Sequence, residues 1–171
     1  MTDHYPYRIE TATGDLTLLW RAGEGDAHDA FLVDGVGRLL VFPDLDRLQG
    51  HCEHHGRTLV RADAVPLDLD AVRGWVERPR CDSVSAGTLL DAWNFFDDLA
   101  HGLGAESALP PQGPVHDSAY EKVFGGEVLA GDVGDGAWSE EERAAVGGFL
   151  RAGLRLWDQA VRESLATPGE E

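Results

Sequence analysis

The feature that most constrains the fold is a strongly patterned helix in the middle of the chain. Between Ala86 and Leu103, apolar residues recur at spacings of four, three, four and three, which puts them on one face of an α-helix. They are Leu89, Trp93, Phe96, Ala100 and Leu103. We expect this face to pack in the core and the opposite face to meet solvent or a partner.

A second long helix is predicted at the end of the chain. Ser139 and Glu142 form a capping box, in which each side chain can bond the other's backbone N–H. The acids Glu140–Glu142 also suit the positive end of a helix. Apolar residues then continue at helical spacing to about residue 165: Val146, Leu150, Leu154, Trp157, Val161 and Leu165.

The first third of the chain has the pattern of strands joined by tight turns. Segments 7–12 and 16–21 flank Thr13-Gly14-Asp15, and segments 30–33 and 38–42 flank Asp34-Gly35-Val36-Gly37. Glycine in such turns supplies the positive φ that hairpins require. The segments therefore predict two hairpins that form an antiparallel sheet.

Shorter elements follow the predicted hairpins. A helix begins near Pro43, carries Leu45, Leu48 and Cys52 at helical spacing, and ends before Gly56. A short strand is expected at 58–61, and Asp68 can cap another short helix that ends before Pro79. Residues 104–118 and 124–138 are expected to be irregular. The prediction is one α+β domain over 1–171, with an antiparallel sheet of hairpins packed against about four helices.

Charge excludes several classes of function. The chain has 31 Asp and Glu against 14 Lys and Arg, a net charge of -17, which opposes binding to nucleic acid or anionic membranes. The only lysine, Lys122, does not stand in a Gly-Lys-Ser/Thr sequence, so a P-loop is excluded. The excess of acid is larger after residue 85, with 16 acidic and five basic residues.

The start of the chain suggests a location. MTDHYPYRIE contains neither a basic segment nor an apolar one of the kind found in secretory leaders. We therefore expect the protein in the cytoplasm, with Cys52 and Cys81 as reduced, small apolar residues.

The polar face of the central helix is the first candidate site. Asp91, Asn94, Asp98 and His101 follow one another at spacings of three, four and three, with Asp97 at the margin. A catalytic acid would need a buried carboxyl group, and a hard cation would need more oxygens than one helix face supplies. A basic partner needs only an accessible face. From the residues alone, the first interpretation is a solvated polar face opposite the core, and partner binding is the functional hypothesis that we retain for this face.

The acidic loops add to this candidate surface. Glu127, Asp132 and Asp135 lie in the glycine-rich stretch before the last helix, without the alternating carboxylates of a calcium loop. We include these three residues in the expected partner-binding surface. Glu24, Asp26 and Asp29 form a similar loop near the N-terminus.

A histidine-rich segment is the candidate for a metal site. In His51-Cys52-Glu53-His54-His55, His51 and His55 are one helical turn apart and could ligate a transition metal. The spacing is not that of a zinc protease. Histidines at the negative end of a helix are also expected without any metal. We therefore expect no metal and no cofactor here, and keep His51 and His55 as weak candidates.

Three stretches resemble small cytoplasmic immunity proteins of bacterial contact-dependent and polymorphic toxin systems. They are residues 89–100 (LLDAWNFFDDLA), 120–126 (YEKVFGG) and 138–141 (WSEE). The order of a hairpin, a helix after Phe-Pro-Asp and a second helix containing Trp75 is similar too. Gly125 stands where that group has a bulkier residue. The resemblance covers roughly residues 30–157 and implies a non-enzymatic inhibitor that binds one cognate toxin domain.

The expected function combines the charge with this resemblance. We expect an acidic immunity protein or antitoxin without catalytic residues, whose partner is a basic toxin domain, such as a nuclease that presents Lys and Arg to phosphate. Two alternatives remain open at this point. One is a metal-dependent enzyme that uses the His51 and His55 region, and the other is an acidic regulatory or scaffold module unrelated to toxins.

Overall fold

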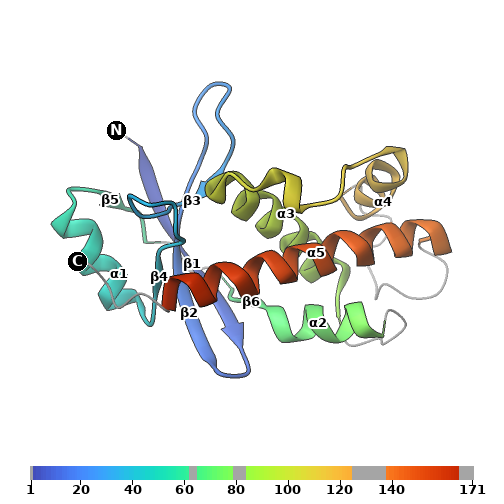
Figure 1. Cartoon of the computed structure of the whole chain (residues 1–171), viewed down its shortest axis with the longest axis horizontal. Helices are drawn as coiled ribbons and strands as arrows, with labels where there is room; N and C mark the ends of the chain where they lie inside the picture. Colours follow the sequence, from blue (N-terminus) through green and yellow to red (C-terminus); the bar gives the residue numbers. More distant parts are fainter. Residues whose placement is uncertain (1, 62–64, 79–83, 125–137, 166–171) are drawn as a thin grey trace.

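The computed structural model describes residues 2–61, 65–78, 84–124 and 138–165 (Figure 1). The strands are β1 (Asp3–Thr11), β2 (Gly14–Arg21), β3 (Ala30–Phe31), β4 (Val41–Phe42), β5 (Thr58–Leu59) and β6 (Leu67–Asp68). The helices are α1 (Leu45–His54), α2 (Leu69–Glu77), α3 (Ala86–Leu103), α4 (Pro114–Phe124) and α5 (Glu140–Leu165), with a short 3-10 turn η1 (Glu106–Ala108). The chain is α+β, as predicted.

The sheet is built around the long first hairpin. β1 and β2 pair in antiparallel register from His4 with Arg21 to Thr11 with Gly14, and Gly14 has a φ of 129°. β3 and β4 both pair with β2, also antiparallel. β5 and β6 pair with β1 in parallel, so the sheet is mixed rather than purely antiparallel. A parallel neighbour requires a crossover connection, which α1 provides between β4 and β5.

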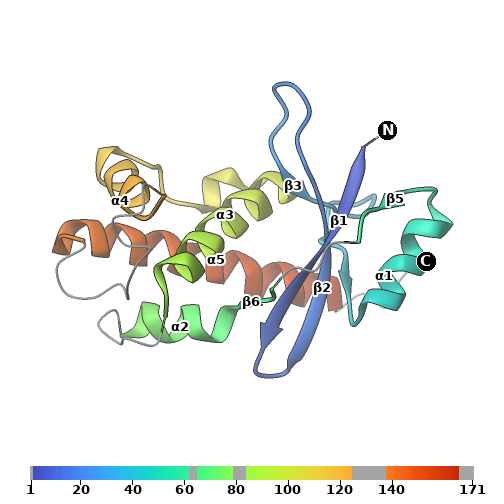
Figure 2. The same ribbon diagram turned by 180° about the vertical axis from the view of Figure 1, so that it is seen from behind.

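Alternate residues of β2 face opposite layers of helices. Leu18 belongs to the main core with residues of α2, α3 and α5, whereas Leu19 packs with Leu48 and Cys52 of α1. This is the two-residue period of a strand whose two faces are both covered. Figures 1 and 2 show β1 and β2 standing between α1 on one side and the other helices on the other.

Side-chain caps begin the helices where the sequence predicted them. Asp68 accepts from the N–H of Ala71 (3.0 Å), and Ser139 and Glu142 accept from each other's N–H groups at 3.1 Å. Gly104 ends α3 with a φ of 63°. Each cap satisfies backbone groups that the helix end leaves open.

Close packing joins α3 to its two main neighbours. Trp93 of α3 stacks on Phe149 of α5 with ring centroids 4.7 Å apart. A β-carbon at Gly102 would lie 2.2 Å from the carbonyl oxygen of Phe31, and one at Gly153 would lie 2.2 Å from the ring of Phe96. Both contacts therefore require glycine: Gly102 where the end of α3 lies against β3, and Gly153 where α5 lies against α3.

One local prediction is confirmed and one is corrected. The second hairpin is present: Val33 and Leu39 form an antiparallel bridge, and the N–H of Leu40 donates to the carbonyl of Leu32 (3.1 Å). Its two arms include β3 and β4, which pair with different parts of β2. Residues 114–124 form a helix, α4, that was not predicted: residues 104–118 were expected to be loop, and no element was assigned to 119–123. The structure therefore has five α-helices in its described residues rather than about four. Pro114 begins it, a position where proline's missing N–H is harmless. Ala119 of α4 accepts a hydrogen bond from the buried indole of Trp138 (3.0 Å), which fixes α4 through a tertiary contact.

Within the described ranges, none of the helices combines the length and the apolar character that crossing a membrane requires.

Candidate protein-interaction surface

The two faces of α3 are divided as the spacing predicted. Leu89, Trp93, Phe96 and Ala100 are buried in the main core. On the other side Asp91 and Asn94 are exposed, and Asp97 and Asp98 are half-buried. The packing of the apolar stripe therefore leaves this polar face at the surface.

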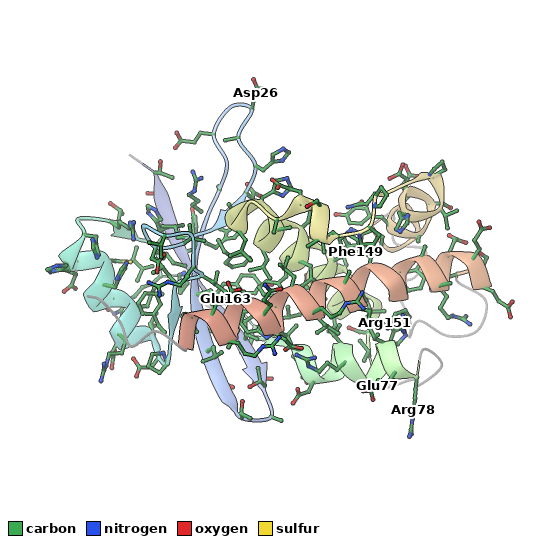
Figure 3. All side chains as sticks on the ribbon, viewed as in Figure 1. Asp26, Glu77, Arg78, Phe149, Arg151 and Glu163 are labelled. Atoms are coloured by element: carbon green, nitrogen blue, oxygen red, sulfur yellow. The ribbon has the colours of Figure 1, made fainter. Side chains whose placement is uncertain are left out.

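The structure adds a second element to this face, the loop 22–29. A hollow of about 490 Å³ lies between the loop and α3, lined by Trp20, His28, Asp29, Asn94, Asp97, Asp98 and His101. Figure 3 shows Asp26 at the tip of the loop, pointing away from the body of the molecule. We call the six carboxylates of the loop and α3 the acidic face: Glu24, Asp26, Asp29, Asp91, Asp97 and Asp98.

Asp98 is the most perturbed carboxyl group of the acidic face. Its Oδ2 accepts from the indole N–H of Trp20 at 3.0 Å. Burial raises the pKa of Asp98 to about 6, opposed by the Trp20 hydrogen bond and the charge of His101 and helped by the negative charges of Asp29 and Asp97. Burial also raises the pKa of Asp91. Helical spacing places Asp98 on the polar side of α3 but does not indicate this half-burial.

Two histidines connect the loop to the helix. The rings of His28 and His101 stack with centroids 4.1 Å apart. Nδ1 of His101 lies 2.8 Å from the carbonyl oxygen of Asp97, and because a carbonyl only accepts, this nitrogen carries a proton. The stack holds the loop against the end of α3. No local pattern indicates that His28 and Trp20 lie here, because their contacts to α3 join residues more than 70 positions apart.

Hydrogen bonds at its base define the shape of the loop. The N–H of Gly23 donates to Oδ1 of Asp29 (2.7 Å), and the N–H of Ala27 donates to the carbonyl of Glu24 (3.1 Å). A β-carbon at Gly23 would lie 1.8 Å from the carbonyl oxygen of Ala27. Gly23 thus permits a tight turn that another residue would force open.

Asn94 connects α3 to α4. Its Oδ1 accepts from the hydroxyl of Tyr120 at 3.0 Å, and Tyr120 also packs edge-on against Trp93. Asn94 therefore has a structural contact in addition to its place on the predicted surface.

Three further residues of the predicted surface, Glu127, Asp132 and Asp135, lie outside the described residues.

The electrostatics of the acidic face are unbalanced. None of its six carboxylates makes an ion pair with Arg or Lys in the described part of the chain. Carboxylates and an amide beside aromatic rings suit an Arg or Lys side chain, which can pair with the acids and stack on the rings. A carboxyl group that titrates near neutral pH also suits proton transfer, but the residues that line the hollow include no Ser, Cys or Lys nucleophile.

The predicted histidine pair is found at the end of α1. The rings of His51 and His55 have centroids 4.3 Å apart. Nε2 of His51 lies 3.0 Å from the guanidinium of Arg57, which can only donate, so this nitrogen is already an acceptor. Burial, followed by the charges of His55, Arg57 and His54, lowers the pKa of His51. Among the residues that the structure describes, no group of three His, Cys, Asp or Glu is placed to hold a metal ion.

Comparison of the chain with models of protein families, with curated proteins and with solved structures gives no match.

Proposed function

We propose that the protein is a non-enzymatic acidic binding protein that neutralises a basic protein, with a cognate toxin domain as the partner. The observation that carries the proposal is the acidic face. Asp29 of the loop and Asp97 and Asp98 of α3 line one hollow, and no Arg or Lys is paired with them in the described ranges. A surface of this kind attracts a positively charged partner and repels nucleic acid and anionic membranes.

The perturbed pKa of Asp98 supports the same proposal. A half-buried carboxylate beside two other acids is destabilised in its charged form, and a partner's guanidinium or ammonium group would relieve that repulsion. Toxins that cleave nucleic acid must present Lys and Arg to phosphate, so an acidic protein can occupy the same surface. Electrostatic attraction would also make the association fast.

The test is co-purification with the protein encoded by the neighbouring gene, followed by binding measurements. We expect a complex whose association rate falls at least about tenfold between low and moderate salt, because exposed charges are screened within about 8–10 Å. The triple variant Asp91→Asn, Asp97→Asn, Asp98→Asn should bind at least about tenfold more weakly.

A matched control separates the acidic face from total charge. Asp3→Asn, Asp46→Asn, Glu53→Gln removes three exposed acids from β1 and α1 and the same number of charges. This control should bind like the unmodified protein. Equal weakening by both triple variants, or a complex indifferent to salt, would argue against the proposal.

A further inference from the structure

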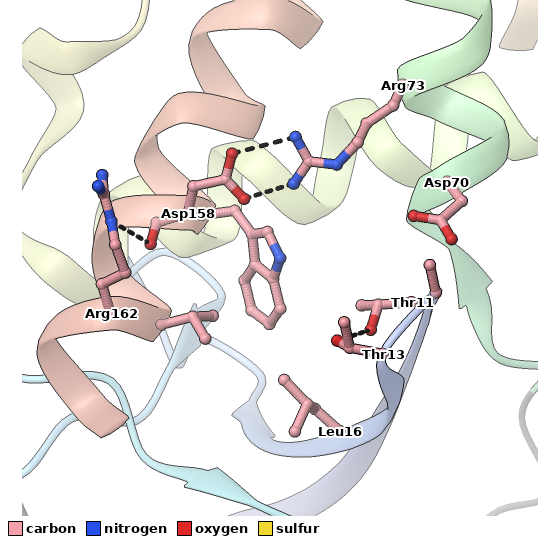
Figure 4. Close-up of a pocket in the computed structure, with 10 residues that line it drawn as sticks. Thr11, Thr13, Leu16, Asp70, Arg73, Asp158 and Arg162 are labelled. Carbon is pink, nitrogen blue, oxygen red and sulfur yellow. Dashed lines mark hydrogen bonds and ion pairs between the residues drawn. The ribbon is translucent and has the colours of Figure 1, made fainter. Parts of the chain in front are cut away.

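A second hollow, separate from the acidic face, lies between the tip of the first hairpin and the helices α2 and α5 (Figure 4). Its volume is about 520 Å³, within the range of small-molecule sites. Trp157, Leu16 and Val161 give it apolar surface, and the hairpin contributes Thr11, Ala12 and Thr13. We call this hollow the hairpin groove.

Charged residues of alternating sign line the helical side of the hairpin groove. Arg73 of α2 pairs with Asp158 of α5 through both carboxylate oxygens, so these two charges satisfy each other. Asp70 and Arg162 remain, and Figure 4 shows them at opposite ends of the groove with the Arg73–Asp158 pair between them. The apolar surface therefore has one negative and one positive group at its ends.

Neither end group has its charge satisfied within the described part of the chain. The carboxylate of Asp70 makes no hydrogen bond or ion pair there. Arg162 uses its Nε to donate to the backbone carbonyl of Asp158 (3.3 Å), which leaves its two terminal nitrogens for a ligand. Asp70 can accept from a cation, and Arg162 can donate to an anion.

Trp157 provides a further donor. Its ring is buried and lines the hairpin groove, but its indole N–H is not enclosed and makes no hydrogen bond in the described ranges. A carbonyl group of a ligand in the groove can accept from this N–H.

We propose that the hairpin groove binds a short apolar peptide with free termini, whose ammonium group lies at Asp70 and whose carboxylate lies at Arg162. Net charge decides between this ligand and a simple anion. At a protein charge of -17, and with Asp70 and Asp158 at the groove, an anion would be repelled, whereas a dipolar peptide is neutral overall. Its apolar side chains would cover Leu16, Val161 and the edge of Trp157.

The test is an NMR titration of the full chain with the dipeptide Leu-Leu up to about 10 mM. We expect saturable shifts of the Trp157 indole N–H and of the Leu16 and Val161 signals. N-acetyl-Leu-Leu-amide has the same apolar side chains but no charge, and should bind at least about tenfold more weakly.

Two exposed-residue variants assign the ends of the peptide. Asp70→Asn should remove the advantage of a free amino group, so that N-acetyl-Leu-Leu binds as well as Leu-Leu. Arg162→Gln should remove the advantage of a free carboxylate, so that Leu-Leu-amide binds as well. Glu163→Gln changes a neighbouring exposed charge on the same helix and should leave the affinity unchanged.

The outcomes that overturn the proposal are specific. They are equal binding of the doubly capped peptide, no shift at Trp157 over the whole titration, or the same weakening by Glu163→Gln as by Arg162→Gln. None of these results bears on the acidic face, because the two hollows have no lining residue in common.

Discussion

Asp98 is the residue at which stability and the proposed binding oppose each other. Its carboxyl group is half-buried between Trp20 and two other acids, and burial raises its pKa from 3.8 to about 6. At neutral pH the group is charged in an environment that disfavours the charge. A residue chosen only for stability would be neutral here, so the carboxylate fits a role in contacting a cation.

The raised pKa of Asp98 determines how its contribution depends on pH. Below pH 3.8 the group is protonated in both the folded and unfolded states and carries no penalty. Between about pH 3.8 and 6 the folded state keeps the proton that the unfolded state loses, so this contribution to stability falls as pH rises and is lost above pH 6. Asp98→Asn should therefore stabilise the protein at pH 8, on the order of 1 kcal/mol after allowance for its solvent exposure, and leave it unchanged at pH 3.5.

Urea unfolding at the two pH values measures this difference. Asp46→Asn, at an exposed site of α1, is the control and should show no comparable gain at pH 8. A direct titration of the Asp98 carboxyl carbon by NMR checks the cause. If that carbon titrates near pH 4, the burial argument is wrong.

At the scale of elements, Gly102 controls how closely α3 approaches the sheet. A β-carbon there would lie 2.2 Å from the Phe31 carbonyl oxygen, a backbone atom held in β3. Gly102→Ala should lower the free energy of unfolding by about 1–3 kcal/mol, since the clash outweighs the gain of about 1 kcal/mol in helix propensity. Urea unfolding at neutral pH is the measurement.

A second glycine in a helix provides the comparison. Gly50 lies on the exposed side of α1, where an added β-carbon meets nothing within 4 Å. Gly50→Ala should stabilise the protein by up to about 1 kcal/mol. If both alanine variants changed stability alike, the close approach of α3 to β3 would not be what requires Gly102.

Sequence patterns predicted the long elements better than the short ones. The limits of α3 agree with the predicted helix, and α5 begins after the predicted Ser139 cap, because apolar spacing and capping are local properties. α4 has a weaker pattern and depends on contacts such as the Trp138–Ala119 hydrogen bond. β3 and β4 have only two residues each and are defined by their pairing with β2.

At the scale of the whole molecule, the net charge of -17 acts on stability as well as on partners. Like charges on a folded surface repel each other more than in the expanded unfolded chain. Raising NaCl from about 10 mM to about 500 mM should therefore increase the free energy of urea unfolding by about 1 kcal/mol, since salt screens this repulsion. Urea is used because, unlike guanidinium chloride, it adds no ions.

A fall in stability with added NaCl would show that attractive ion pairs outweigh the repulsion between like charges. If NaCl lowered the stability, ion pairs such as Arg73–Asp158 would contribute more than the general repulsion. The Asp91→Asn, Asp97→Asn, Asp98→Asn variant should have a smaller salt response than the unmodified protein, because part of the repulsion is removed.

Some parts of the candidate sites can be predicted from residues close together in the chain. Helical spacing alone predicts the polar face of α3, with Asp91, Asn94 and Asp98. It also predicts that His51 and His55 lie on the same side of their helix, one turn apart. The hairpin groove could not be predicted in this way. It combines residues of β1, β2, α2 and α5, and no local pattern indicates that Asp70 and Arg162 share a cavity.

Sequence patterns are enough to predict the α+β class, the two long helices with their buried stripes, and the acidity that limits the kinds of partner. These properties depend on composition and on residues a few positions apart. Three contacts become visible only in the folded molecule: the loop 22–29 meets α3, Trp20 bonds to Asp98, and His28 stacks on His101. Such contacts depend on how distant segments pack together, which the spacing of residues along the chain does not contain.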